Sequence, residues 1–129
     1  MSLIKVKPED VIESLVKIIG GVDAEIIFVT CIDDNGDISD SECFASATQP
    51  KNSVPLDELF YLAERMGAPA VLFTSTSSGS ITELHECDVD FTRRLIEGGR
   101  ERGIVVHDHI LVEGDTFRIM SQCTDLWKG

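Results

Sequence analysis

The stretch DVDFTRRLIEGGRERGIVVHDHILV, residues 88–112, changes its hydrophobic period partway along. Phe91 and Leu95 lie one helical turn apart, as do Thr92 and Ile96, which is typical of an amphipathic helix. From residue 104 the chain is a short run of β-branched and aliphatic residues, which is typical of a buried strand. The stretch therefore predicts a helix over residues 87–102 and a strand over 104–112.

Two neighbouring glycines, Gly98 and Gly99, fall inside this predicted helix. Each destabilises a helix interior by about 1 kcal/mol relative to alanine. Their presence indicates either close packing against the helix or an early helix end.

Outward from this stretch, the same patterns predict the rest of one domain. Helices are expected over residues 8–19 and 55–66, and strands over 25–32, 38–45, 68–73 and 116–120. The order α-β-β-α-β-α-β-β predicts a single α/β domain over residues 1–129, with a mixed sheet flanked by about three helices.

Charge and composition limit the classes of partner. The chain has 129 residues and a net charge of −12, which disfavours contact with phosphate backbones, so no nucleic acid is expected. No apolar run approaches the roughly 20 residues of a membrane helix, and no secretory signal is recognised, so a cytoplasmic protein is expected. Its four cysteines have irregular spacings and are expected to be reduced and mostly buried.

Three segments together resemble one protein family. IIFVTCIDDNGDI (26–38), SVPLDELFYLAERMGAPAVLFTSTSSG (53–79) and the opening stretch are similar to the RadC-like branch of the JAB/MPN (JAMM) domains. The resemblance covers about residues 24–127, beyond an N-terminal helix within 1–21. It implies a JAB/MPN-like fold with the layering of cytidine deaminases.

The resemblance also implies where a metal site belongs. The family motif is H-x-H, seven residues, then S-x-x-D, with a glutamate on an earlier strand; it holds zinc for amide hydrolysis. An ungapped comparison places the two histidines at Ser75 and Ser77, the serine at His85 and the aspartate at Asp88. Glu25 is the counterpart of the glutamate. Because hydroxyls are poor zinc ligands, the resemblance implies a degenerate site without zinc or other cofactor.

The leading hypothesis is therefore a binding or interaction module. A pocket lined by Ser75, Ser77, Ser78 and Asp88, with Glu25 nearby, is expected to contact a protein or peptide partner or a second copy of this chain. Asp88 also suits the first turn of the third helix, where a carboxylate favours the helix dipole.

Other hypotheses remain open at this point. A metal-dependent hydrolase could use a shifted ligand set drawn from Glu25, His85, Asp88, His107 and His109. His107 and His109 form an H-x-H on a strand, so both imidazoles are expected on one face, although Asp108-His109 also resembles a structural pair of the family. His85 could alternatively act as base for Ser75 or Ser77. A structural or oligomerising domain without a pocket is the third hypothesis.

Overall fold

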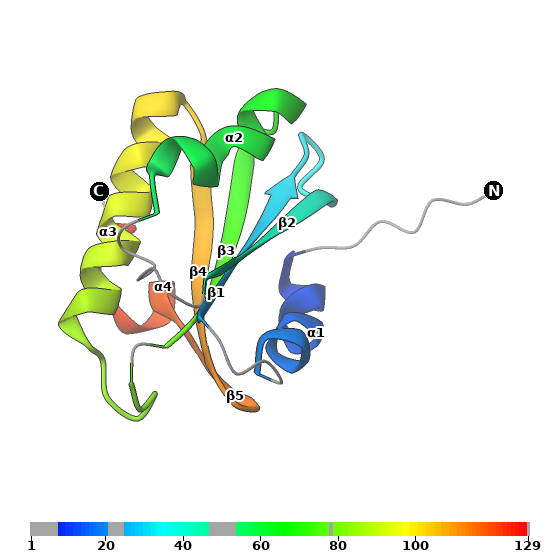
Figure 1. Cartoon of the computed structure of the whole chain (residues 1–129). Helices are drawn as coiled ribbons and strands as arrows, with labels where there is room; N and C mark the ends of the chain where they lie inside the picture. The colour runs from blue at the N-terminus through cyan, green and yellow to red at the C-terminus, as the bar shows by residue number, and fades with distance from the viewer. Residues whose placement is uncertain (1–7, 21–24, 47–53, 78, 129) are drawn as a thin grey trace.

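The computed structural model describes residues 8–20, 25–46, 54–77 and 79–128 (Figure 1). A five-stranded sheet has the strand order β2-β1-β3-β4-β5. Only the β3–β4 pair is parallel; β1–β2, β1–β3 and β4–β5 are antiparallel. The elements are α1 (Pro8–Gly20), β1 (Glu25–Ile32), β2 (Ile38–Ser46), α2 (Leu56–Met66), β3 (Ala70–Thr76), α3 (Glu86–Arg102), β4 (Val105–Glu113), β5 (Thr116–Ile119) and α4 (Met120–Cys123). The predicted α/β class and mixed sheet are confirmed, and α4 is an addition that the sequence patterns did not predict.

Helices cover both faces of the sheet (Figure 1). On one face, α2 and α3 bury Phe60, Phe91 and Leu95 against the sheet. The ring of Phe60 meets that of Phe73 edge to face, with centroids 5.4 Å apart. On the other face, α1 packs Ile19 and its neighbours against the sheet. The central strands are therefore buried on both sides.

The end of β3 differs from the prediction. The strand was expected to stop at Phe73, but it continues through Thr74 and Ser75 to Thr76. Ser75 is paired with Ile27 of β1 and with Leu111 of β4. Because both neighbouring strands continue, backbone pairing extends β3 into the run of hydroxyl residues, and threonine suits a strand.

A β-bulge in β4 corrects a second expectation. Val71 is paired with Val106, and Leu72 with Asp108, so His107 is the extra residue. The bulge turns His107 to the exposed surface, where it lines a cavity that includes Ile12 of α1. His109 is instead buried toward α3. The two imidazoles therefore lie on opposite faces, and the expectation of a shared face is wrong.

The glycine pair in α3 is explained by packing. The helix runs through both glycines to Arg102, so there is no early end. A Cβ atom on Gly99 would lie 2.4 Å from the carbonyl oxygen of Ile104. One on Gly98 would lie 2.9 Å from a methyl group of Leu56. At position 99 only glycine leaves room for the backbone just before β4, whereas the contact at position 98 is with the end of a flexible leucine side chain.

The cysteines are less buried than expected. None of the four forms a disulfide, but only Cys31 is buried; Cys43 and Cys87 are exposed and Cys123 is intermediate. Burial raises the pKa of the Cys31 thiol to about 11. The expectation of mostly buried cysteines is therefore wrong. None of the helices in the described part of the chain is long and apolar enough to cross a bilayer.

Candidate functional site

A chain of hydrogen bonds joins the end of β3 to the start of α3 through His109 of β4. The hydroxyl oxygen of Ser75 lies 2.7 Å from Nε2 of His109. On the other side of the ring, Oγ1 of Thr92 lies 2.7 Å from Nδ1. Thr92 also donates to the carbonyl oxygen of Asp88 at 2.9 Å. All four residues are 0% exposed, so the chain is sealed inside the domain.

The number of available protons determines which group donates and which accepts in each hydrogen bond of this chain. Thr92 has one hydroxyl proton, which goes to the Asp88 carbonyl, so Thr92 accepts from Nδ1–H of His109. In the neutral imidazole, Nε2 is then an acceptor, and the Ser75 hydroxyl donates a hydrogen bond to it. Both ring nitrogens are thus engaged by hydroxyl groups, so in this arrangement neither Nδ1 nor Nε2 offers a free lone pair to a metal.

The imidazole is also held by its surroundings. The ring of Phe91 packs edge-on against it, with centroids 5.5 Å apart. Asp108 accepts from the backbone N–H of His109 at 2.8 Å and from that of Ser121 at 3.1 Å. The Ser121 hydroxyl donates to the second oxygen of Asp108. These contacts agree with a structural reading of the Asp108-His109 pair.

The predicted site residues are only partly brought together. Ser75 and Asp88 both belong to the buried chain around His109. The N–H of Ser77 donates to the carbonyl of Val112 at 2.9 Å, which continues the strand pairing past Thr76. Ser78 lies outside the described residues. The prediction that these residues line a ligand pocket stays a prediction.

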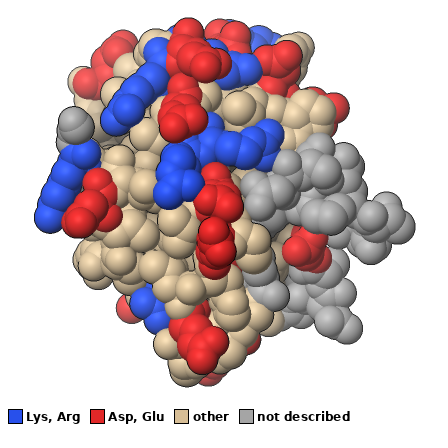
Figure 2. Space-filling view, turned by 90° about the vertical axis from the view of Figure 1, so that its left-hand side faces the viewer, with Lys and Arg blue, Asp and Glu red and all other residues tan. Residues whose placement is uncertain are grey.

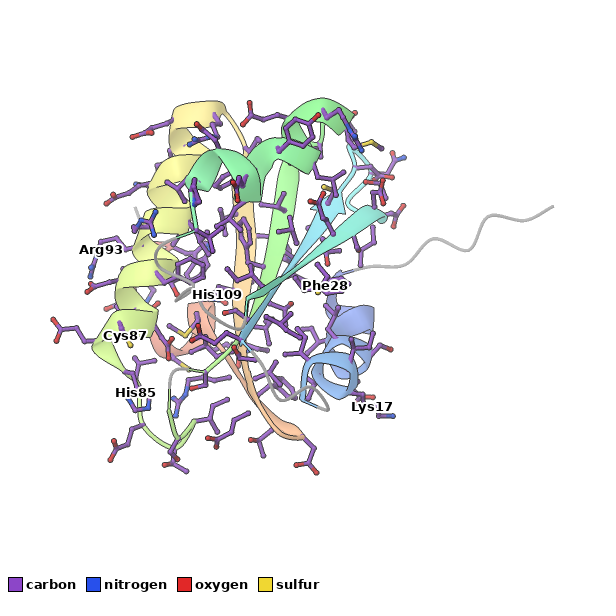
Figure 3. All side chains as sticks on the ribbon, in the orientation of Figure 1. Lys17, Phe28, His85, Cys87, Arg93 and His109 are labelled. Carbon is purple, nitrogen blue, oxygen red and sulfur yellow. The ribbon has the colours of Figure 1, made fainter. Side chains whose placement is uncertain are left out.

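The remaining candidates, Glu25 and His85, are not members of this chain, although Glu25 lies two residues before Ile27, the β1 partner of Ser75. Glu25 is the first residue of β1, opposite Ser46 of β2. His85 directly precedes α3, and its Nε2 lies 2.9 Å from the carbonyl oxygen of Ser80. Figure 3 shows His85 on the loop below α3 and His109 inside the domain. Within the residues that the structure describes, no three His, Cys, Asp or Glu side chains are grouped so that they could hold a metal ion.

The base nearest to Ser75 is His109, which sequence reasoning did not pair with it. A serine and a histidine at 2.7 Å, with the histidine oriented by a third group, resemble a nucleophile and its general base. Burial opposes that role, because a substrate carbonyl cannot reach the fully enclosed Ser75 hydroxyl. The spacing of Asp88 and Thr92, one turn apart beside Phe91, was the available sign that α3 turns polar groups inward.

The loop between β3 and α3 is fastened to the β4–β5 hairpin. The N–H of Ile81 donates to Glu113 at 3.2 Å. The carbonyl oxygen of Ile81 accepts from Nε and Nη2 of Arg118, at 3.2 and 2.6 Å. Side chains of the hairpin therefore hold both polar groups of this residue, which fixes the loop at the strand end.

Comparisons of the sequence with known proteins point to one family. The RadC-like JAB domain family model matches residues 5–124, which includes α1. A UPF0758 protein of Symbiobacterium thermophilum is 33% identical over 106 residues, covering 81% of this chain and 45% of that protein. A UPF0758 protein of Desulforamulus reducens is 31% identical over 111 residues, covering 85% and 48%. The chain spans less than half the length of these relatives. It belongs to the RadC-like JAB domain family.

Proposed function

We propose that this domain is a degenerate, metal-free member of its family that acts by binding a protein or peptide. The supporting observation is the buried chain Ser75–His109–Thr92. In the motif comparison, Ser75 stands where the family has its first metal-binding imidazole. Here the Ser75 hydroxyl is committed to a buried imidazole, whose second nitrogen is committed to Thr92.

The chemistry of the remaining donors supports the same proposal. Zinc in a catalytic site takes three protein ligands, usually imidazole, thiolate or carboxylate. Ser77, at the second imidazole position, offers only a neutral hydroxyl. Asp88 alone keeps a family ligand, and one carboxylate cannot hold zinc at ordinary cellular concentrations. Hydrolysis through a metal-activated water therefore lacks support.

A binding role agrees with the packed framework of the domain and with its net charge. The central strands, the helix packing and the fastened loop are held by contacts of the protein itself, and elements held in this way present a recognition surface well. A net charge of −12 favours a protein or peptide over a nucleic acid.

Metal content tests the first half of the proposal. We expect protein purified without chelator or metal-affinity resin to carry far less than one zinc per chain by elemental analysis. Its melting temperature should be the same with and without a chelator. About one zinc per chain, lost together with stability, would refute the metal-free assignment.

Peptide selection tests the second half. A phage-displayed library of 12-residue peptides is selected against the intact chain. A binding peptide should raise the melting temperature, because a ligand that binds only the native state stabilises it. Absence of any enriched peptide that does so would contradict a peptide-binding role.

A further inference from the structure

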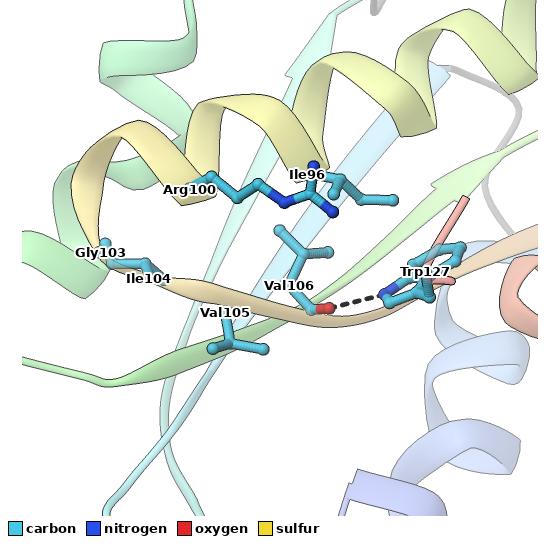
Figure 4. A pocket seen from close by; sticks show the side chains of 7 residues that line it. All are labelled: Ile96, Arg100, Gly103, Ile104, Val105, Val106 and Trp127. Atoms are coloured by element: carbon cyan, nitrogen blue, oxygen red, sulfur yellow. Dashed lines mark hydrogen bonds between the residues drawn. The ribbon is translucent and has the colours of Figure 1, made fainter. Parts of the chain in front are cut away.

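A cavity of about 370 Å³ lies between the C-terminal half of α3, the start of β4 and the C-terminal segment (Figure 4). Its apolar lining includes Ile96, Val105, Val106 and Trp127. This volume is within the range of small-molecule sites. The cavity shares no residue with the buried chain of Ser75, His109 and Thr92, although Ile96, which lines it, is one helical turn beyond Thr92 on α3.

The shape of the cavity is set by specific side-chain contacts. The indole N–H of Trp127 donates to the carbonyl oxygen of Val106 at 2.8 Å, which fixes the aromatic ring at one end (Figure 4). Val105, at the other end, is 63% exposed, an unusual exposure for a valine that begins a strand. The site therefore offers apolar surface that is open to a ligand.

Of the residues that the structure describes, one charged residue, Arg100, lines this cavity. The side chain of Arg100 extends from α3 above Val106 (Figure 4). In the described part of the chain no carboxylate lies within ion-pair distance of its guanidinium, whereas Arg93 is paired with Asp90 and Arg102 with Asp57. An acidic chain thus leaves an uncompensated cation over an apolar cavity, which is complementary to an anion with an apolar body.

We propose that this cavity binds a small organic monoanion: a carboxylate or sulfonate whose alkyl or aromatic body lies against Val106 and Trp127. Arg100 binds the anionic group, since a guanidinium matches the geometry of a carboxylate. The neighbouring cavity shares Ile96 and Arg100 and is also lined by the charged residues Arg93, Glu97, Asp125 and Lys128. Arg93 and Lys128 are paired with Asp90 and Asp125, so among the described residues Arg100 is the one lining cation without an ion pair, which favours a single anionic group. The proposal is independent of the function proposed above, because zinc content does not affect it.

Trp127 makes the test direct, because it is the only tryptophan of the chain. Octanoate is titrated while Trp127 emission is recorded, with octanol as the uncharged probe of similar length. We expect a saturable change with octanoate and at least tenfold weaker binding of octanol.

Three variants locate the site. Arg100→Gln should weaken octanoate binding about tenfold and leave octanol binding unchanged. Val105→Asp, at an exposed position, should also weaken octanoate binding, because it adds a carboxylate to the lining. Arg93→Gln is the matched control: it removes the same charge from the same helix at a residue that does not line this cavity, and it should bind like the parent.

Several outcomes would overturn the proposal. They are no saturable change in Trp127 emission, equal binding of octanoate and octanol, and equal losses in Arg100→Gln and Arg93→Gln. Melting curves of all variants confirm that each is folded when it is compared. A negative result here would leave the metal-free assignment of the strand end unaffected.

Discussion

The polar groups at the two ends of α3 differ in their burial. At its start, Thr92 and the Asp88 carbonyl join a sealed chain with His109, in which donors and acceptors are matched. Near its end, Arg100 is exposed over an open apolar cavity. The buried end contains the residues that resemble a catalytic site, yet it cannot be reached from solvent. The open end holds none of the family's metal-motif positions, yet it offers both space and charge to a ligand.

The arrangement of side chains that resembles a catalytic site and the access of a ligand from solvent therefore occur at different ends of α3. A buried histidine that is hydrogen-bonded to two hydroxyls contributes mainly to folding stability, because buried polar groups without partners destabilise the native state. An exposed arginine contributes little to stability and is free to contact a ligand. Substitutions should therefore affect stability at the first end and binding at the second.

The largest effect on stability is expected for His109→Leu. It leaves the buried Ser75 hydroxyl without its partner and removes the donor to the Thr92 oxygen, which should cost about 2–4 kcal/mol of unfolding free energy. Urea denaturation measures the loss. His107→Leu is the control, because it removes an exposed imidazole two residues away and should change stability by less than about 0.5 kcal/mol. Similar losses for both would mean that the buried chain is not stabilising.

Rebuilding the family motif tests the same end through metal binding. Ser75→His, Ser77→His and His85→Ser together should bind zinc at least tenfold tighter than the parent, because they supply two imidazoles beside Asp88. The variant should be less stable without zinc by about 1–3 kcal/mol, since an imidazole at position 75 overpacks the space against His109. Hydrolysis is expected to be weak or absent.

Zinc titration of parent and variant measures this gain. Asp88→Ala in the variant is the control and should remove most of it. Equal affinities, or indifference to the loss of Asp88, would show that the register across residues 75–88 is wrong.

A smaller effect is expected from Ser75→Ala. It removes the hydroxyl that donates to Nε2 of His109 and should lower the unfolding free energy by about 1–2 kcal/mol. Ser77→Ala is the matched comparison, because among the described residues the Ser77 hydroxyl has a single, long contact, 3.5 Å from the N–H of Gly79. Equal losses at the two serines would argue against a special role for position 75.

No measurable effect is expected with nucleic acid. Among the arginines of α3, Arg93 and Arg102 are paired with carboxylates, and Figure 2 shows basic and acidic side chains interspersed on this face. At near-physiological salt, binding to duplex or single-stranded DNA should be no tighter than about 10⁻⁴–10⁻⁶ M. A salt-sensitive, sub-micromolar complex in a fluorescence anisotropy titration would overturn this expectation.

Periodicity predicted most of the fold because strong patterns set most elements. The predicted bounds of β1 agree with the structure, since its apolar run is closed by the turn around Gly36. The end of β3 was missed because pairing with two neighbours outweighs side-chain polarity. The bulge at His107 was missed because a shift in register between strands leaves no mark in one strand's own sequence.

The candidate site was predicted less completely, for a related reason. Sequence comparison placed Ser75, Ser77 and Asp88 by spacing along the chain, and His85 was considered as a base because it is close in sequence. The partner that the fold supplies is His109, 34 positions from Ser75. Tertiary contacts of that kind follow from strand order, which periodicity does not specify.

The fastening of Ile81 has a consequence for how the domain opens. Glu113 and Arg118 hold its N–H and its carbonyl oxygen, so the loop cannot fray by itself while the hairpin stays in place. The hairpin in turn lies against the last residue of α1, where a Cβ atom on Gly20 would fall 1.7 Å from the carbonyl oxygen of Gly114. Loop, hairpin and helix end should therefore exchange their amide hydrogens as one cooperative unit, on one timescale.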